Sequence, residues 1–193
     1  SNGGTRQGAE AAANIDVGAI QKKIDEYTEA IKNDPKNDKY YGARGQNYSR
    51  IGKHEKAIDD LSKAIALNPA RQAYFDVRGN CFNRLTRYKQ ASDDYERAIA
   101  IGPPNWSLYQ RRASCAIFLH DYKSAVDYGQ SALKMSPNNV DTLALLGSCE
   151  RELGQLESSL VHLTKANELN PNDASVLRLR AETLMSMGKK DLA

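Results

Sequence analysis

The sequence lacks most of the features by which an enzyme, a membrane protein or a nucleic-acid-binding protein is recognised. No apolar run reaches the roughly 18 residues that a helix needs to span a bilayer, so we expect no membrane insertion. The formal net charge is only +3 over 193 residues, so a nucleic-acid partner is not expected. The given residues show no phosphate-binding glycine loop, zinc-protease motif or nucleophile elbow. No secretory leader is visible in them, and the sequence leaves open that one was cut away. We therefore expect no enzyme activity, no cofactor and no metal.

Proline is scarce, but it recurs at a constant interval. Five of the six prolines are evenly spaced, and alanine and glycine recur at the same interval in further columns. A fixed period between about 20 and 50 residues indicates stacked structural repeats. The columns are Pro35, Pro69, Pro103, Pro137 and Pro171; Ala30, Ala64, Ala98, Ala132 and Ala166; Ala57, Ala91 and Ala125; and Gly45, Gly79 and Gly147.

Each block of this period predicts two helices. In the first full block, apolar side chains recur at helical spacing over Lys39–Ile51 and again over His54–Leu67. Gly52 separates the two segments, and Pro69 follows the second because proline cannot continue a helix. Small residues let the two helices approach closely, while larger apolar side chains fill the grooves around them. The pattern therefore predicts a stack of antiparallel helix pairs.

This block resembles a tetratricopeptide repeat, a helix–turn–helix unit of about 34 residues. The resemblance covers about nine tenths of the chain and implies an all-α, right-handed solenoid of antiparallel helix pairs. The chain departs from the family pattern at Gly129, which we expect to leave a notch or weaken its helix. It departs again at Glu150, which we expect in a site that is open to water. In the first block the pattern is carried by Tyr41, Gly45, Tyr48, Ala57, Leu61, Ala64 and Pro69.

The repeat pattern also predicts how the chain is divided. We expect about four full repeats with a half repeat at each end, as in a piece of a longer protein. The last predicted helix, Ala174–Met187, has only the start of a partner at Lys190–Ala193, so we expect its uncovered face to pack on another chain or to fray. The predicted segments are 1–16 (a flexible leader or tag remnant) and 17–193 (the array), with 17–37 as the second helix of a partial repeat, 38–71, 72–105, 106–139 and 140–173 as full repeats, and 174–193 as a truncated repeat.

The three cysteines occupy one position in three consecutive repeats. Cys81, Cys115 and Cys149 are separated by the repeat period, and Asn47 and Thr183 hold the same position in the flanking repeats. We interpret the position as a small buried side chain, because equivalent atoms of neighbouring repeats lie too far apart for a disulfide. Free thiols fit a reducing compartment, so we expect a cytoplasmic location.

Other residues with chemical potential are interpreted as structural. His54, His120 and His162 fall at three different repeat positions and form no metal-binding spacing, so we expect them in turns or on the surface. The carboxylate pairs 59–60 and 93–94 lie on predicted second helices, where we expect a solvated outer face rather than a catalytic dyad.

In the resembled family, the first helix of each repeat lines a concave groove. The equivalent positions here carry an arginine in every block, interleaved with amide and apolar side chains. Arginine pairs with carboxylates through two hydrogen bonds, and amides can hold the backbone of an extended peptide. The residues that the resemblance places in the groove are Lys39, Gln46, Arg50, Val77, Asn80, Asn83, Arg84, Gln110, Arg111, Ile117, Phe118, Leu145, Arg151 and Arg178.

These positions predict a protein–protein interaction module, or scaffold, that binds an extended or helical segment with acidic and apolar residues. The sequence leaves open that the arginines only pair with neighbouring carboxylates. Two further alternatives are a docking domain of a larger co-chaperone or enzyme whose active domain lies elsewhere, and a scaffold that self-associates through its last helix. The carboxylate clamp of some co-chaperones is not matched: only Arg111 fits its five positions in one register, and only Asn80 in the next.

Overall fold

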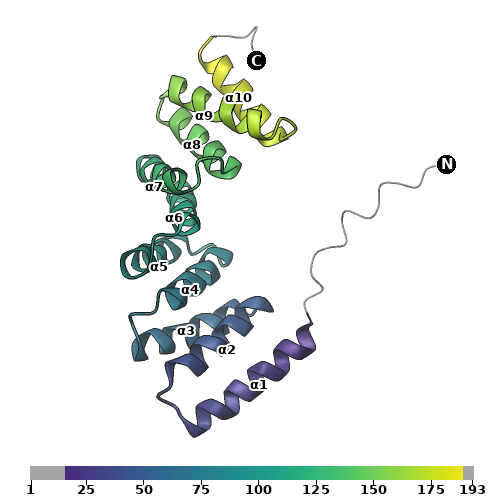
Figure 1. Cartoon of the computed structure of the whole chain (residues 1–193), viewed down its shortest axis with the longest axis vertical. Helices are drawn as coiled ribbons and strands as arrows, with labels where there is room; N and C mark the ends of the chain where they lie inside the picture. The colour runs from purple at the N-terminus through teal and green to yellow at the C-terminus, as the bar shows by residue number, and fades with distance from the viewer. Residues whose placement is uncertain (1–15, 189–193) are drawn as a thin grey trace, which may run out of the picture. The chain divides into compact units, whose positions relative to one another are not determined.

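Ten α-helices and no strand make up residues 16–188, the part of the chain that the computed structural model describes (Figure 1). The expected all-α fold is confirmed. Most of the predicted leader, and the helix start predicted at 190–193, lie outside the described residues. Within the described range, no helix combines the length and the apolar character that a bilayer crossing requires. The chain divides into two compact units between Pro69 and Ala70, and each unit is described by itself.

The N-terminal unit consists of an antiparallel pair and one additional helix (Figure 1). The pair is close because Gly45 has no side chain. A Cβ there would lie 2.9 Å from Cγ of Leu61 and 3.2 Å from the backbone oxygen of Ala57, and both partners are completely buried. The helices are α1 (Val17–Asn33), which packs on α2, and the pair α2 (Asp38–Arg50) and α3 (His54–Leu67).

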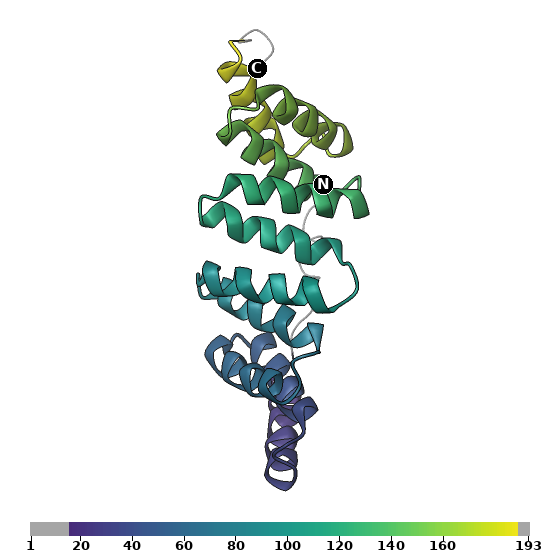
Figure 2. The ribbon, with the colours of Figure 1, turned by 90° about the vertical axis from the view of Figure 1, so that its left-hand side faces the viewer.

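The C-terminal unit repeats this arrangement three times and adds a last helix. Each second helix also packs against the first helix of the next pair, and the last helix packs on both helices of the preceding pair. Figure 2 shows the helices of the pair at residues 106–135 lying side by side. The pairs are α4 (Gln72–Arg84) with α5 (Tyr88–Ile101), α6 (Trp106–Phe118) with α7 (Tyr122–Met135), and α8 (Val140–Glu152) with α9 (Leu156–Leu169); α10 (Ala174–Ser186) follows.

The turn between the two helices of a repeat contains one residue with positive φ. In three repeats this residue is glycine, at Gly52, Gly154 and Gly188, with φ between 73° and 75°. In the two middle repeats the same position holds Thr86 and His120, both with φ of 58°. Thr86 is β-branched, a type seldom found in this left-handed region, whereas histidine is found there more often. The strain that glycine would relieve is therefore greater at Thr86 than at His120.

The expected outer-face carboxylates divide into an exposed and a buried member, so that prediction was wrong for half of them. Asp60 is 7% exposed and accepts hydrogen bonds from Nε and Nη2 of Arg44, both at 2.7 Å. Asp94 is 5% exposed and is held in the same way by Arg78, at 2.8 and 2.7 Å. Each pair joins the first helix to the second helix of one repeat, because the two residues face each other across the antiparallel pair.

The expected notch at Gly129 and the expected open site at Glu150 are corrected as well. No notch is left at Gly129, because a Cβ there would lie 2.9 Å from Cδ2 of Leu146, which fills the space from α8. Glu150 is 2% exposed rather than open to water, and its Oε2 lies 2.7 Å from Nδ1 of His162. His162 is therefore partly buried and holds a carboxylate on the neighbouring helix, so its assignment to a turn or the surface was wrong.

Candidate partner-binding surface

In the C-terminal unit, an ion pair joins the first helices α4 and α6, and another joins the first helices α8 and α10. Arg111 of α6 donates from Nη1 to Asp76 of α4, and Arg151 of α8 donates from Nη1 to Glu182 of α10. An ion pair requires its two side chains to meet, so the first-helix faces that carry these residues adjoin one another. We name the surface of the first helices that carries Asp76, Arg111, Arg151 and Glu182 the first-helix face.

The α4 part of the first-helix face rests on a buried tyrosine. Asn80 donates from its amide nitrogen to Asp76 at 3.1 Å, and its amide oxygen accepts the hydroxyl hydrogen of Tyr95 at 2.9 Å. The Tyr95 side chain has no exposed surface, and burial raises its pKa. The hydroxyl thus remains a donor, and it fixes the orientation of the Asn80 amide and, through it, the carboxylate that holds Arg111.

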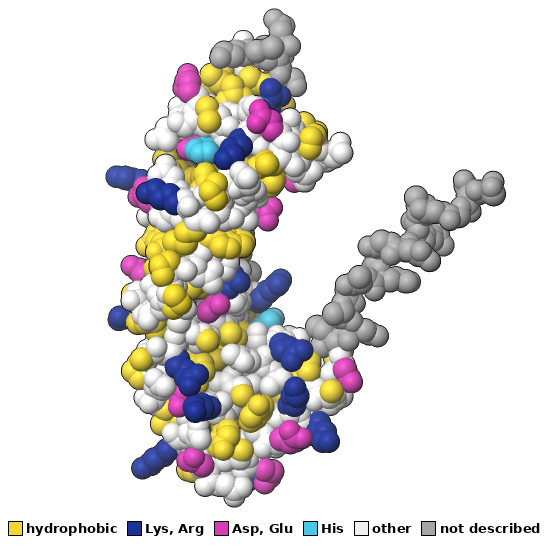
Figure 3. Space-filling model, viewed as in Figure 1, with side chains coloured by type: hydrophobic (Ala, Val, Ile, Leu, Met, Phe, Trp, Pro, Cys, Tyr) yellow, Lys and Arg dark blue, Asp and Glu magenta, His cyan; other side chains and the backbone are white. Residues whose placement is uncertain are grey.

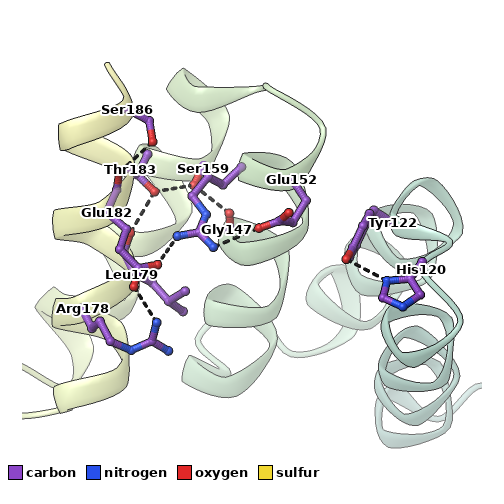
Figure 4. A network of polar contacts seen from close by, with 11 residues as sticks. His120, Tyr122, Gly147, Glu152, Ser159, Arg178, Leu179, Glu182, Thr183 and Ser186 are labelled. Carbon is purple, nitrogen blue, oxygen red and sulfur yellow. Dashed lines mark hydrogen bonds and ion pairs between the residues drawn. The ribbon is translucent and has the colours of Figure 1, made fainter. Parts of the chain in front are cut away.

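The α8–α10 part of the first-helix face forms a second polar network (Figure 4). Glu182 accepts hydrogen bonds from Arg178 and Arg151, and both interactions lower the pKa of its carboxyl group. Beneath it, the hydroxyl of Ser159 donates to the backbone oxygen of Gly147 at 2.7 Å and lies 3.1 Å from the hydroxyl of Thr183. These contacts attach α10 to the preceding repeat through side chains as well as through packing.

Three of the five arginines predicted to face a partner are thus paired within the chain: Arg111, Arg151 and Arg178. Figure 3 likewise shows basic and acidic side chains interspersed on the visible face rather than gathered by sign. Arg50 and Arg84 are exposed and make no ion pair with any described residue. The remaining predicted positions are exposed in the cases of Lys39, Gln46 and Phe118, and partly exposed in the cases of Val77, Asn80, Asn83, Gln110, Ile117 and Leu145.

The thiols face inward. Cys81, Cys115 and Cys149 form no disulfide and are at most 1% exposed. Asn47 and Thr183 are buried at the equivalent positions, so the predicted small buried position is confirmed. Burial raises the pKa of Cys115 to about 11 and that of Cys149 to about 12. Among residues 16–188, no group of three or more His, Cys, Asp or Glu side chains is arranged to hold a metal ion.

Sequence reasoning missed the stacking partner of Phe118. The rings of Phe118 and Tyr88 are parallel within 6°, with centroids 4.2 Å apart. Tyr88 begins a second helix, whereas the predicted groove residues all belong to first helices. The two residues occupy different positions within their repeats, so comparison of equivalent positions could not pair them.

The repeat array matches family models and is similar to solved structures of other proteins. Family models described as tetratricopeptide repeats match residues 38–71 and 119–183, which together span just over half of the chain. The crystal structure of YrrB, described as a TPR protein with an unusual peptide-binding site, is similar with a TM-score of 0.80, 22% identity and 87% of each chain covered. MamA gives a TM-score of 0.76 at 20% identity, covering 81% of this chain and 92% of MamA.

MamA residues 41 to the end, from Desulfovibrio magneticus, also give a TM-score of 0.76, at 18% identity, covering 80% of this chain and 88% of the other. At such identities the structural likeness shows the fold alone. A comparison with curated proteins found no match. The family models, the repeat period and the ten helices of the described residues agree. The chain belongs to the tetratricopeptide repeat family.

Proposed function

We propose that this chain is a non-enzymatic protein-interaction module whose first-helix face binds an extended or helical segment of another protein. Two ion pairs support the proposal: Asp76–Arg111 joins α4 to α6, and Arg151–Glu182 joins α8 to α10. The face between them offers side-chain amides and partly exposed apolar groups. The peptide-binding site named for YrrB, which has the same fold, gives the proposal further support.

The chemistry of the partner follows from which groups are available. Asp76 and Glu182 already neutralise Arg111 and Arg151, so a ligand carboxylate would have to displace them. The side chains of Asn83 and Gln110 make no hydrogen bond with any described residue, and Leu145 is partly exposed. We therefore infer that amides hold the peptide backbone and that apolar groups seat its side chains. The absence of disulfides among the three cysteines is consistent with our proposal of a cytoplasmic location.

The test is an array of short immobilised peptides of acidic, basic and apolar composition. We compare the unchanged chain with the double variant Asn83→Ala/Gln110→Ala on the first-helix face. The matched control is Gln90→Ala/Gln130→Ala, which removes two exposed glutamine amides from second helices. Loss of two hydrogen bonds should weaken bound peptides about tenfold in the first variant and leave the control unchanged. Equal binding by all three proteins would contradict the proposal.

A second candidate function is self-association through α10, with a second copy of the chain as its partner. Leu177 is 44% exposed, whereas Leu143, its equivalent one repeat earlier, is completely buried. Arg180 has a buried Nε without a hydrogen-bond partner among the described residues, although its equivalents in α2 and α4 pair with carboxylates. In α1, Glu26 occupies the position of those carboxylates and is exposed. Glu26 of a second copy could therefore supply the negative charge that Arg180 lacks.

Sedimentation velocity over a range of protein concentrations tests self-association. We expect a dimer or larger species that Leu177→Glu disrupts, because a charge placed in an apolar interface is costly. Val161→Glu is the matched control, since Val161 is 67% exposed on α9. A monomer at every concentration would remove this candidate, and it would leave the peptide-binding proposal untouched.

A further inference from the structure

The two middle repeats carry an aromatic and aliphatic patch at the turns between their helices. Phe118 is the last residue of α6, is 55% exposed, and stacks on Tyr88, the first residue of α5. Leu119, which follows in the turn, is 41% exposed. Exposed aromatic side chains held in place by their neighbours are typical anchors of protein interfaces. We name Arg84, Tyr88, Phe118, Leu119 and Lys123 the turn-edge patch.

Stacking on Tyr88 fixes the orientation of the Phe118 ring while leaving much of it exposed to water. Tyr88 covers the ring from one side and holds it parallel within 6°, while more than half of the side chain remains exposed. A partner that covers this exposed surface therefore immobilises few additional rotamers, and that lowers the entropic cost of binding.

Basic side chains flank the same two turns in the sequence. Arg84 lies four residues before Tyr88, Lys123 lies five residues after Phe118, and both are exposed without an ion pair to any described residue. The nearest carboxylate in the sequence, Asp121, is engaged at the start of α7, where it accepts the backbone N–H of Ser124 at 3.1 Å. Hydrogen bonds from the side chain and from the backbone of Ser124 lower the pKa of Asp121, and the charges of Arg112 and Lys123 act in the same direction. The patch thus combines two stacked rings with two basic side chains that flank the same turns in the sequence and make no ion pair with any described residue.

The backbone of the same two turns is strained. Thr86 and His120 adopt φ of 58° at the position where the other three repeats have glycine. His120 lies beside the patch, with its Nδ1 3.2 Å from the hydroxyl of Tyr122 (Figure 4). Folding alone would favour glycine at both positions, and strain that persists in a structure is concentrated at functional sites. The repeats that carry the stack are the same repeats that keep side chains in their turns.

We propose that the turn-edge patch is a second protein-binding surface, whose ligand is an acidic linear segment with one aromatic side chain. The aromatic side chain packs on Phe118 and Leu119, and the flanking carboxylates pair with Arg84 and Lys123. This inference shares the protein-binding role of the proposed function, and Arg84 and Phe118 are also among the predicted groove positions. Its variants differ from Asn83→Ala/Gln110→Ala, so the two proposals can fail separately. It also explains why the chain keeps two basic side chains outside the ion pairs of the first-helix face.

Fluorescence polarisation with a defined peptide set tests the proposal. The probes are labelled peptides with a central Trp, Leu or Ala, flanked on both sides either by three aspartates or by three lysines. We expect the aspartate-flanked Trp peptide to bind most tightly. Phe118→Ala should weaken it about tenfold, and so should Arg84→Glu. Val161→Ala, which truncates a side chain of similar exposure on α9, should not. Circular dichroism of each variant verifies the fold.

Three results would overturn the turn-edge patch. One is that no peptide of the set binds, and another is that lysine-flanked peptides bind equally well. The third is that Phe118→Ala binds like the unchanged chain while Asn83→Ala/Gln110→Ala does not. The last result would place the acidic ligand on the first-helix face and would support the proposed function while removing the patch. Tyr88→Ala is the second variant, because it loosens Phe118 without deleting it and should weaken binding less than Phe118→Ala.

Discussion

Asp93 and Asp94 are adjacent carboxylates on α5 that lie at very different depths. The Asp94 side chain is 6% exposed and accepts two hydrogen bonds from Arg78. The Asp93 side chain is 55% exposed and pairs with Lys89 at 2.9 Å, itself 75% exposed. Replacing each aspartate by alanine removes the same chemical group from the same helix, so the difference between the two variants measures the effect of burial.

The expected magnitudes follow from the environment of each cation. The Arg78 side chain is 19% exposed in the unchanged chain and lies against the rings of Phe75 and Phe82. Asp94→Ala removes the carboxylate that pairs with it. Breaking a buried pair from one side costs about 3–5 kcal/mol, and because water reaches part of Arg78 we expect the lower end of this range. Asp93→Ala breaks an exposed pair and should cost less than about 0.5 kcal/mol.

The Asp94 carboxyl is itself held at a desolvation cost. Burial raises its pKa, and the hydrogen bonds and charge of Arg78 only partly offset that rise. Replacing both partners, as in Arg78→Met/Asp94→Ala, removes the buried positive charge as well as the carboxylate that pairs with it. This double variant should therefore recover much of the stability that Asp94→Ala alone loses.

Urea unfolding measures these differences. Far-UV circular dichroism reports on all helices, and the fluorescence of Trp106 reports on the unit that contains α5. With a slope of about 1–3 kcal/mol per M, a loss of about 3 kcal/mol lowers the midpoint by about 1 M or more. Equal midpoints for Asp93→Ala and Asp94→Ala would refute the reasoning, because they would mean that the Arg78 pair behaves as a surface pair.

Three further predictions concern packing, thiol ionisation and the second buried carboxylate. Gly147→Ala places a Cβ 2.4 Å from Cγ of Leu163, so we expect a loss of about 1–2 kcal/mol in urea unfolding, whereas Ser148→Ala should change stability little. Burial raises the pKa of Cys149 to about 12, so thiol reagents should react with it only after unfolding, and rapid labelling of the folded chain at pH 8 would contradict this. Because the unfolded thiol ionises near pH 8.5, the free energy of unfolding should fall as the pH rises from about 8.5 towards 12. His162→Ala leaves Glu150 buried without its hydrogen-bond partner and should cost about 1–3 kcal/mol, whereas His120→Ala, at an exposed position, serves as the control and should cost less.

The repeat period was sufficient to predict what the repeats share. It identified the helix pairs and the small buried position of the three cysteines, because a position that recurs once in every repeat meets the same surroundings each time. The buried state of Asp94 was missed because the interpretation considered each helix alone. The signal was present: Arg44 with Asp60, and Arg78 with Asp94, have the same spacing along the chain.

The candidate surface was less predictable than the fold. The resemblance placed Arg111 and Arg151 among groups free to bind a carboxylate, and only coordinates show that Asp76 and Glu182 reach them from neighbouring repeats. One partner lies slightly more than a repeat period away and the other slightly less, so no single spacing indicates them. A contact between different repeats therefore cannot be predicted from the sequence of one repeat alone.

The departures from the repeat pattern compensate one another across helices. In the first, second and fourth repeats, a glycine of the first helix faces a large side chain of the second, as Gly147 faces Leu163. The third repeat has Ala113 and Gly129 at these positions instead, and Leu146 of the next repeat fills the space over Gly129.

Leu146 stands where other repeats have an arginine, so no cation there needs the carboxylate that the first two repeats carry on the facing helix. His162 occupies the position of that carboxylate and turns to Glu150 instead. A departure at one position therefore indicates a matching departure on a helix that packs against it. A substitution that restores the family residue at only one of them removes half of a matched pair.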